Sequence, residues 1–222
     1  MHAPRKITLE YQRNGKDTKK TVEFIPATGD QFVVKELLID EIYNFDFKWD
    51  DTVLNIGWHI GTFDIFAFDR VREIITYEPM QSDFEKLQKH LAMNKIENVR
   101  AINKAVVADK VDTIKFYTTQ SWHHSLLPWG KEIEVWAEYI WDIYESHQFT
   151  KIKCDCEGWE YSIFSIPVPL SVNEIRMETH TRDKELLDMH KELIAYFENQ
   201  GFEVEEIKND EKDRTFLLHC KR

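Results

Sequence analysis

Residues 55–61, Asn-Ile-Gly-Trp-His-Ile-Gly, have the composition of a ligand-binding loop that follows an apolar run and opens a segment with helical spacing. Gly57 allows the chain to turn sharply, and Gly61 would let the backbone approach a ligand closely. About 20 residues further on, Glu78 ends the next apolar run, where its carboxylate can accept hydrogen bonds from both hydroxyls of a ribose. The loop and Glu78 together predict a cofactor that contains ribose, and a nicotinamide dinucleotide would satisfy both features.

Carboxylates and an imidazole follow two later apolar runs. Asp155 and Glu157 come after one run, and Glu178 and His180 stand at the end of the next. Ligands of parallel sheets bind outside the carboxyl ends of the strands, so these side chains are expected near the same edge. A carboxylate or His180 placed there could remove a proton from a hydroxyl group as a general base. His180 is equally consistent with a histidine that is only hydrogen-bonded at a strand end.

The elements that must position these residues alternate between strand and helix. Strands are predicted at residues 52–56, 73–77, 99–107, 151–156 and 172–179, with helices at 62–71, 82–93, 136–147 and 184–199. Residues 113–117 predict an added strand, residues 118–131 a loop rich in aromatic residues, and 202–207 with 215–220 a terminal antiparallel hairpin. The fold class is therefore α/β, a Rossmann-like and mostly parallel twisted sheet, with the fourth strand between the first and the fifth.

The first residues predict a separate extension. Residues 6–12 and 20–25 flank Asn14-Gly15, which favours a tight β-hairpin, and residues 30–44 have the apolar spacing of a helix. We expect residues 1–48 to form this hairpin and helix, and residues 49–222 to form the Rossmann-like domain.

Charge and composition limit the partners. The chain has 222 residues and a formal net charge of −11, which argues against a nucleic-acid or anionic membrane surface. No apolar run is long enough to span a bilayer, and no secretory signal is visible. The three cysteines lack the spacing of a disulfide framework and indicate reduced thiols, so we expect a cytoplasmic protein. The negative net charge leaves a small molecule as the expected substrate. The oligomeric state does not follow from these observations.

Several motifs, taken in order, resemble the FkbM-like family of S-adenosylmethionine-dependent methyltransferases. They are the loop at residues 55–61, Glu78-Pro79, Asn103-Lys104-Ala105, the run Lys-Ile-Lys-Cys-Asp-Cys-Glu-Gly-Trp-Glu at residues 151–160, and Glu178 followed by His180. The resemblance covers residue 30 to the C-terminus. It implies a class I methyltransferase fold, S-adenosylmethionine as cofactor, and methyl transfer to an oxygen of a small molecule or sugar.

The resemblance also implies a role for each matched position. The methionine part of the cofactor would lie along the loop, on Asn55, Gly57, Trp58, His59 and Gly61. Glu78 would hold the ribose, and Asn103 and Lys104 would lie on the adenine side. Asp155 and Glu157 would face the methyl donor and the acceptor, and a carboxylate or His180 could take the proton of the acceptor hydroxyl.

Aromatic residues crowd into the segments expected at this edge of the sheet. A substrate pocket lined by aromatic and polar side chains is therefore predicted, at Trp122, His123, His124, Trp159 and Glu178. Packing in the core is the alternative explanation for the tryptophans.

Three positions depart from the family pattern and predict a reshaped cofactor pocket. Asn55 replaces an acid, and Trp58 and Trp159 replace small residues. Because all three fall at one pocket, the chain is either a divergent natural member or a deliberate redesign that has lost methyl transfer.

Other functions remain open for a reshaped pocket. Cys156 with His59 could form the nucleophile and base of a hydrolase, with an oxyanion site near Gly158. A binding domain without chemistry is another option. A metal site would draw on His123, His124, Asp155, Glu157 and His180. Because no recurrent ligand spacing supports it, no metal is predicted.

Overall fold

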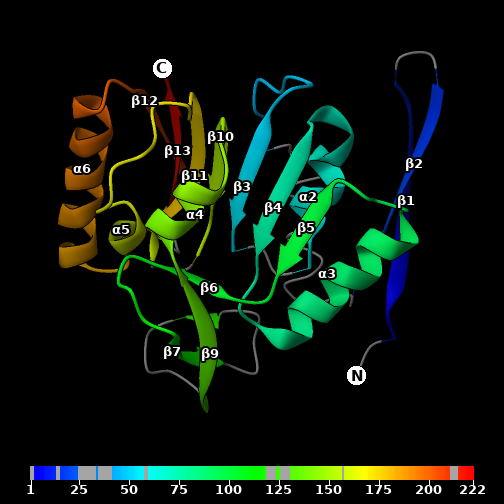
Figure 1. Cartoon of the computed structure of the whole chain (residues 1–222), viewed down its shortest axis with the longest axis horizontal. Coiled ribbons are helices and arrows are strands. Elements are labelled where there is room, and N and C mark those ends of the chain that lie inside the picture. Colours follow the sequence, from blue (N-terminus) through cyan, green and yellow to red (C-terminus); the bar gives the residue numbers. More distant parts are fainter. Residues whose placement is uncertain are drawn as a thin grey trace.

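A seven-stranded sheet forms the centre of the protein, in a computed structural model that describes residues 3–13, 16–24, 34, 42–57, 60–118, 124–125, 131–156, 158–210 and 215–222 (Figure 1). Its strands are, in spatial order, β12 (Glu203–Asp210), β13 (Thr215–Lys221), β11 (Glu174–His180), β10 (Lys151–Cys154), β3 (Thr52–Ile56), β4 (Glu73–Tyr77) and β5 (Val99–Ile102). The pairs from β11 to β5 are parallel, and β13 is antiparallel to both of its neighbours. The predicted fold class, strand order and terminal hairpin are confirmed.

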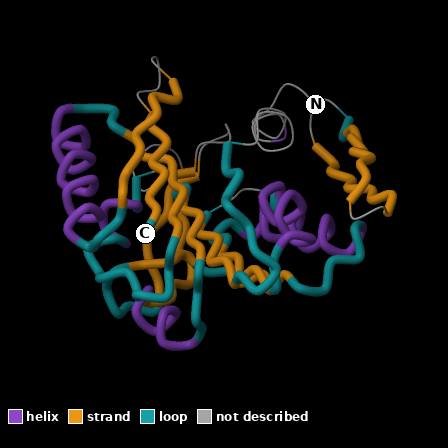
Figure 2. Tube along the Cα trace, turned by 90° about the horizontal axis from the view of Figure 1, so that it is seen from above, coloured by secondary structure: helices purple, strands orange, loops and turns teal. Residues whose placement is uncertain are grey.

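Helices cover both faces of this sheet (Figure 2). They are α2 (Thr62–Ala67), continued by the 3-10 turn Phe68–Arg70, then α3 (Gln81–Met93), α4 (Ile140–Ser146), α5 (Glu160–Ile163) and α6 (Lys184–Asn199). Alternate residues of β3 show the two faces: Leu54 and Ile56 pack in the core that contains α4, α5 and α6, whereas Val53 packs with α2. All of β3 and β10 is buried, as expected for strands covered on both sides.

The structure corrects the bounds of two predicted elements, the strand at 99–107 and the helix at 136–147. The strand expected at 99–107 breaks at Asn103-Lys104, and β6 (Ala105–Val107) leaves the main sheet to pair with β9 (Lys131–Tyr139). The small sheet also contains β7 (Thr113–Thr118) and β8 (His124–Ser125). The helix expected from residue 136 begins only at Ile140, because β9 continues to that point. Trp136 is 64% exposed beside a buried Val135 and Ala137, which is the two-residue alternation of a strand.

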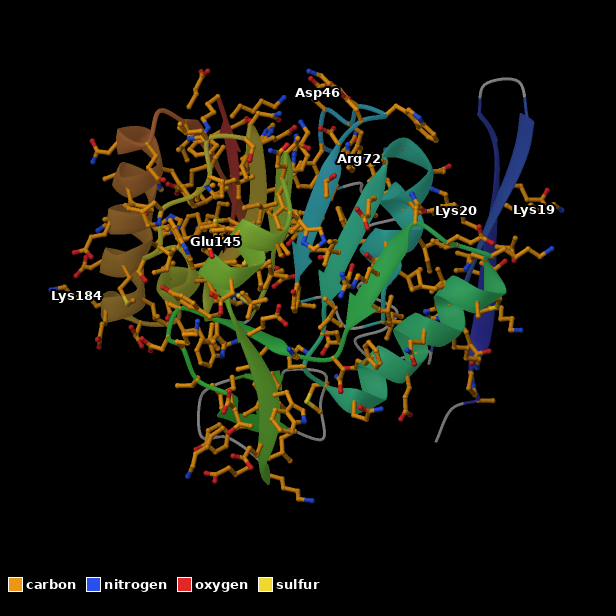
Figure 3. The ribbon with its side chains drawn as sticks, in the orientation of Figure 1. Lys19, Lys20, Asp46, Arg72, Glu145 and Lys184 are labelled. Carbon is orange, nitrogen blue, oxygen red and sulfur yellow. The ribbon has the colours of Figure 1, made fainter. Side chains whose placement is uncertain are left out.

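The N-terminal hairpin packs against the first helices of the domain. It consists of β1 (Arg5–Arg13) and β2 (Lys16–Phe24), as predicted. The Lys20 ammonium is buried and donates hydrogen bonds to the Phe66 carbonyl and the Asp69 carboxylate, both at 2.8 Å. Its neighbour Lys19 is exposed and pairs with Glu10 at 2.5 Å (Figure 3). Most of the predicted helix at 30–44 lies outside the described residues, and the domain boundary at residue 48 stays a prediction.

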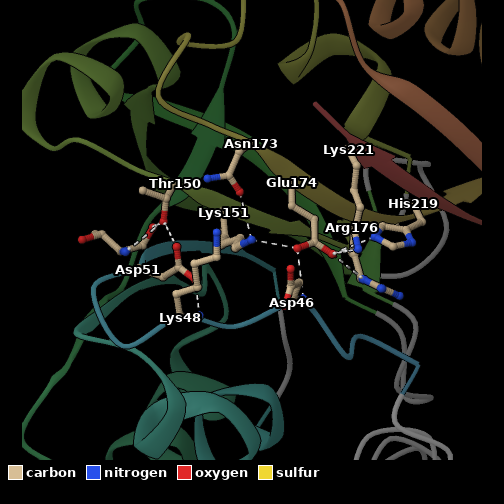
Figure 4. Close-up of polar contacts among 11 residues, drawn as sticks. Asp46, Lys48, Asp51, Thr150, Lys151, Asn173, Glu174, Arg176, His219 and Lys221 are labelled. Atoms are coloured by element: carbon tan, nitrogen blue, oxygen red, sulfur yellow. Dashed lines mark hydrogen bonds and ion pairs between the residues drawn. The ribbon is translucent and has the colours of Figure 1, made fainter.

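The amino ends of the strands are tied by a buried ionic network (Figure 4). The Lys151 ammonium lies 2.8 Å from the Glu174 carboxylate and 2.9 Å from the Asn173 side-chain oxygen. His219 Nε2 and Arg176 Nε contact the second Glu174 oxygen at 2.7 and 3.3 Å. Burial raises the pKa of Glu174, but the hydrogen bond from Lys151 and the other cations outweigh it and leave the pKa lowered. The amino ends of these strands are therefore occupied by structural contacts, which leaves the carboxyl ends of the strands for ligand chemistry.

No helix in the described ranges is long and apolar enough to cross a membrane.

Candidate active site

Gly57 makes the sharp turn that was predicted after β3. Its φ is +67°, and its backbone N–H donates to the Tyr77 carbonyl at 3.0 Å. A Cβ at this position would lie 2.3 Å from the carbonyl oxygen of Asp155, which follows β10. The turn is therefore wedged between β4 and β10, and no side chain fits there without a shift of the backbone.

Gly61 has a different reason to be glycine. Its φ is +78°, and an added Cβ would meet the Leu87 side chain of α3 at 2.3 Å. The space is thus used for packing between α2 and α3, rather than for a ligand. A contact between Gly61 and the cofactor stays a prediction.

A buried polar group under the turn joins Asn55 to helix α2. The Asn55 amide nitrogen lies 3.2 Å from the Asp64 carboxylate and 3.4 Å from the Thr76 hydroxyl, which also donates to Asp64. Burial raises the pKa of Asp64 to about 6. Asn55 Oδ1 and Asp64 Oδ2 have no hydrogen-bond partner among the residues that the structure describes. A buried carboxylate therefore lies beside Asn55, and its sequence signal is an aspartate within the apolar helix α2.

Lys153 places a fully buried ammonium behind the same turn. Its Nζ donates to the Gly57 carbonyl at 2.6 Å, lies 4.0 Å from Asp155 Oδ2, and lies 5.1 Å from the centre of the Tyr43 ring. Burial lowers the pKa of Lys153, while the Asp155 charge opposes that shift. Sequence reasoning missed this lysine, because nothing local indicates that its chain is buried.

Glu78 lies where the ribose-binding acid was expected, directly after β4. It is 4% exposed, and its Oε1 accepts a hydrogen bond from the Met80 backbone N–H at 2.8 Å. Asn103 donates to the Glu78 carbonyl at 2.8 Å and to the Pro79 carbonyl at 3.1 Å. The contacts of Asn103 thus support the loop that carries Glu78.

Lys104, the other residue expected on the adenine side, is turned to Glu138 of β9, with Nζ 2.8 Å from the carboxylate. Its side chain keeps 41% exposure. An adenine contact for Lys104 stays a prediction.

The second predicted constellation is brought together by β10 and β11. Cys154 and Met177 are paired in register, so Asp155 and Glu178 follow side by side. One ligand atom from each of Asp155, Glu178 and His180 lies within 4.8 Å of the others. Two carboxylates and an imidazole in this geometry could share a proton or bind a divalent cation.

Glu160, the first residue of α5, holds this cluster from behind. Its carboxylate accepts hydrogen bonds from the backbone N–H groups of His180 at 3.0 Å and Gly158 at 2.8 Å, and one of its oxygens lies 3.1 Å from His180 Nδ1. Glu160 is fully buried. Sequence reasoning gave Glu160 no role, because it was recognised only as the last residue of the motif at residues 151–160.

Cys156 lies in the wrong surroundings for an activated nucleophile. Its Sγ is 3.4 Å from Cys154 Sγ and donates to Glu160 at 3.6 Å. Burial raises the pKa of Cys156 well above its ordinary value, and the neighbouring thiol and carboxylate raise it further. A reactive thiolate requires the opposite shift. The proposed partner His59 lies outside the described residues.

Several other predicted positions also lie outside the part of the chain that the structure describes: Trp58, Glu157, Trp122 and His123. His124 is described only through its backbone pairing with Thr118 in the small sheet. Trp159 is half-buried and packs against the main core, and its Nε1 has no partner among the described residues. The predicted aromatic pocket therefore stays a prediction.

Comparison with known proteins supports the fold. No protein-family model matches the chain, and no curated protein sequence matches it. An rRNA methylase from Streptococcus thermophilus superposes with a TM-score of 0.52 at 10% identity, over 90% of this chain and 98% of that chain. Fibrillarin from Aeropyrum pernix, solved with natively bound S-adenosyl-L-methionine, gives 0.52 at 13% identity over 96% and 82%. A dimethyladenosine transferase from Plasmodium falciparum gives 0.52 at 10% identity over 83% and 60%.

These likenesses show that the chain has the Rossmann-like fold of the class I methyltransferases. The finer resemblance to the FkbM-like family has no support from a family match and stays a prediction.

Proposed function

We propose that this chain is an S-adenosylmethionine-dependent methyltransferase that acts on an oxygen of a small molecule or sugar. The observation that carries the proposal is the placement of Glu78. Its buried carboxylate accepts a hydrogen bond from the Met80 N–H. Glu78 directly follows Tyr77, whose carbonyl accepts the hydrogen bond from the Gly57 N–H at the turn. An acid and a glycine turn at the carboxyl ends of adjacent parallel strands suit a ribose and the chain attached to it.

The residues around the turn fit such a cofactor. The orphaned buried oxygens of Asn55 and Asp64 provide a negative environment under the turn, which suits the ammonium end of a methionine group. Glu78 would hold the ribose hydroxyls. The bound cofactor supplies an electrophilic methyl group, and the chain's task is to align an acceptor with it, since alignment provides most of the rate enhancement.

The acceptor end of the site would be formed by Asp155, Glu178 and His180. These groups could hold an acceptor hydroxyl by hydrogen bonds and remove its proton. The net charge of −11 favours a small acceptor over a nucleic acid, although two of the structural neighbours are named for rRNA or adenosine methylation.

Calorimetric titration with S-adenosylmethionine, S-adenosylhomocysteine and NAD⁺ tests the proposal. We expect the first two ligands to bind, and Glu78→Gln to weaken both by roughly ten- to a hundredfold, because a hydrogen bond to a charged group contributes about 1.5–3 kcal/mol. Glu73→Gln is the matched control, since Glu73 begins the same strand at its opposite end. Preferential binding of NAD⁺ would indicate a nicotinamide enzyme and contradict the proposal.

A reshaped pocket gives a different outcome. If neither S-adenosylmethionine nor S-adenosylhomocysteine binds at millimolar concentration, the cofactor pocket has been closed or repurposed and the proposal fails. The hydrolase alternative would then require a reactive Cys156, against the surroundings described above.

A further inference from the structure

Two buried oxygens beneath the turn at Gly57 have no hydrogen-bond partner among the residues that the structure describes. They are Asn55 Oδ1, near the end of β3, and Asp64 Oδ2, on α2. Both residues are fully buried. Buried polar atoms in folded proteins are nearly always paired, because an unpaired one destabilises the folded state. A ligand that brings donor groups to this pair would therefore be stabilised there.

The hydrogen bonds within the pair determine which atoms remain for a ligand. The Asn55 amide nitrogen lies 3.2 Å from Asp64 Oδ1, and the Thr76 hydroxyl of β4 donates to the same oxygen. An ionised carboxylate only accepts hydrogen bonds, so Asn55 has to direct its NH₂ group to Asp64 and its amide oxygen away from it. Both remaining atoms are therefore acceptors, and a group that satisfies them has to be a donor.

The Asp64 carboxylate keeps its charge in these surroundings at neutral pH. Burial raises the pKa of Asp64 to about 6, because it outweighs the hydrogen bonds from Thr76 and Asn55 and the positive charge of Lys153. At pH 7.5 the group is still mostly ionised, so the folded protein holds a negative charge where it is poorly solvated. Strongly perturbed carboxylates of this kind are common at functional sites, and a buried charge acts strongly on a nearby ligand because the surrounding dielectric constant is low.

The pair lies close to the groups that would hold the cofactor. Asn55 and Thr76 are partners in the register of β3 and β4. Gly57 follows Asn55 and Glu78 follows Thr76, each by two residues, which is about 7 Å along a strand. A ligand whose ribose is held by Glu78 and whose chain follows the turn can therefore approach Asp64 with the other end of that chain.

We propose that Asp64 is a specificity-determining residue of the cofactor site, which selects nucleosides that carry an amino acid by pairing with their ammonium group. The inference rests on the proposed methyltransferase function and names the part of the cofactor that Asp64 recognises. An ammonium group has three N–H donors and no acceptor, so it complements both Asp64 Oδ2 and Asn55 Oδ1. Its positive charge also compensates the buried carboxylate, and hydrogen bonds between ionised groups are stronger than neutral ones.

Calorimetric titration at pH 7.5 with S-adenosylhomocysteine and with its deamino analogue, in which hydrogen replaces the amino group, tests the proposal. We expect the wild type to bind S-adenosylhomocysteine roughly ten- to a hundredfold more tightly than the analogue, which is the range for a hydrogen bond to a charged group. Asp64→Asn keeps the shape of the side chain and removes its charge, so the ratio of the two dissociation constants should fall to about three or less. Glu78→Gln is the matched control: both ligands carry the ribose, so it should weaken both and leave the ratio unchanged.

Equal affinity of the wild type for the two ligands would overturn the proposal and leave the methyltransferase function intact. Equal weakening of both ligands by Asp64→Asn would overturn it as well, because the carboxylate would then only support the turn. Urea unfolding checks that the variant is folded, and Asp64→Ser, which also removes the charge, takes its place if Asp64→Asn does not fold. If neither ligand binds to the wild type, the proposed function fails and the role of Asp64 fails with it.

Discussion

Asp64→Asn is expected to change how the stability of the protein depends on pH. Asp64 is fully buried on α2, and burial raises its pKa from 3.8 to about 6 despite hydrogen bonds from Thr76 and Asn55. In the unfolded chain the carboxyl has its ordinary pKa, so between about pH 4 and 6 the folded state binds a proton that the unfolded state lacks. Folding is therefore favoured by acidification across this window, and the contribution is lost as the pH rises through about 6.

The magnitude follows from the two pKa values. A difference of about 2 pH units at about 1.4 kcal/mol per unit corresponds to about 3 kcal/mol, which is the cost of keeping the Asp64 charge buried at neutral pH. About 2 kcal/mol of it should be recovered between pH 7.5 and pH 4.5. The isosteric amide carries no charge at any pH, so Asp64→Asn should be more stable than the wild type at pH 7.5 by up to about 3 kcal/mol, and this advantage should shrink on acidification.

Urea unfolding followed by tryptophan fluorescence, at several pH values from 4.5 to 7.5, measures this difference directly. Comparing the two proteins at each pH cancels the titration of all other groups. Asp188→Asn is the control, because Asp188 is exposed on α6 and its carboxylate lies 3.5 Å from the Lys191 ammonium. A free energy of unfolding that differs between wild type and Asp64→Asn by the same amount at every pH would refute the raised pKa and the buried charge.

Three further outcomes are expected. Gly57→Ala should lower the free energy of unfolding in urea by about 2–4 kcal/mol and abolish cofactor binding, because residue 57 has a positive φ and its Cβ would lie 2.3 Å from a backbone oxygen. Gly201→Ala is the control: residue 201 has a positive φ but no neighbour within 4 Å of the added Cβ, so this change should cost about 1–2 kcal/mol. Lys20→Met should lower the free energy of unfolding by about 3–5 kcal/mol, because the Phe66 carbonyl and the Asp69 carboxylate lose the ammonium that they contact. Lys19→Met, at an exposed position, should change it by no more than about 0.5 kcal/mol. Equal effects of the two substitutions would contradict the packing of the hairpin against the helices. Cys156 should resist an ester-like thiol probe at pH 7.5 in the folded protein, because its pKa is raised; rapid labelling seen by mass spectrometry would revive the hydrolase alternative.

Local patterns in the sequence determined the architecture. The strands β3 and β4 lie at the predicted residues, and α6 spans the predicted helix, because apolar periodicity and the glycine after α6 are local signals. The turn at Gly57 and the acid at Glu78 follow from strand ends in the same way. Residues 136–139 are the start of a predicted helix, and only the pairing of β9 with β7 shows that they belong to a strand.

Only the tertiary structure decided which polar groups act together. Asp64, Lys153 and Glu160 are ordinary residues in the sequence, and each becomes informative through a partner from a distant segment: Asn55, the Gly57 carbonyl and His180. Burial and neighbouring charge determine what a titratable side chain can do, and neither is present in the local pattern of residue types. The sequence thus predicts the edge of the sheet where the chemistry lies, while the identity of the group that holds His180 depends on how α5 packs beside the end of β11.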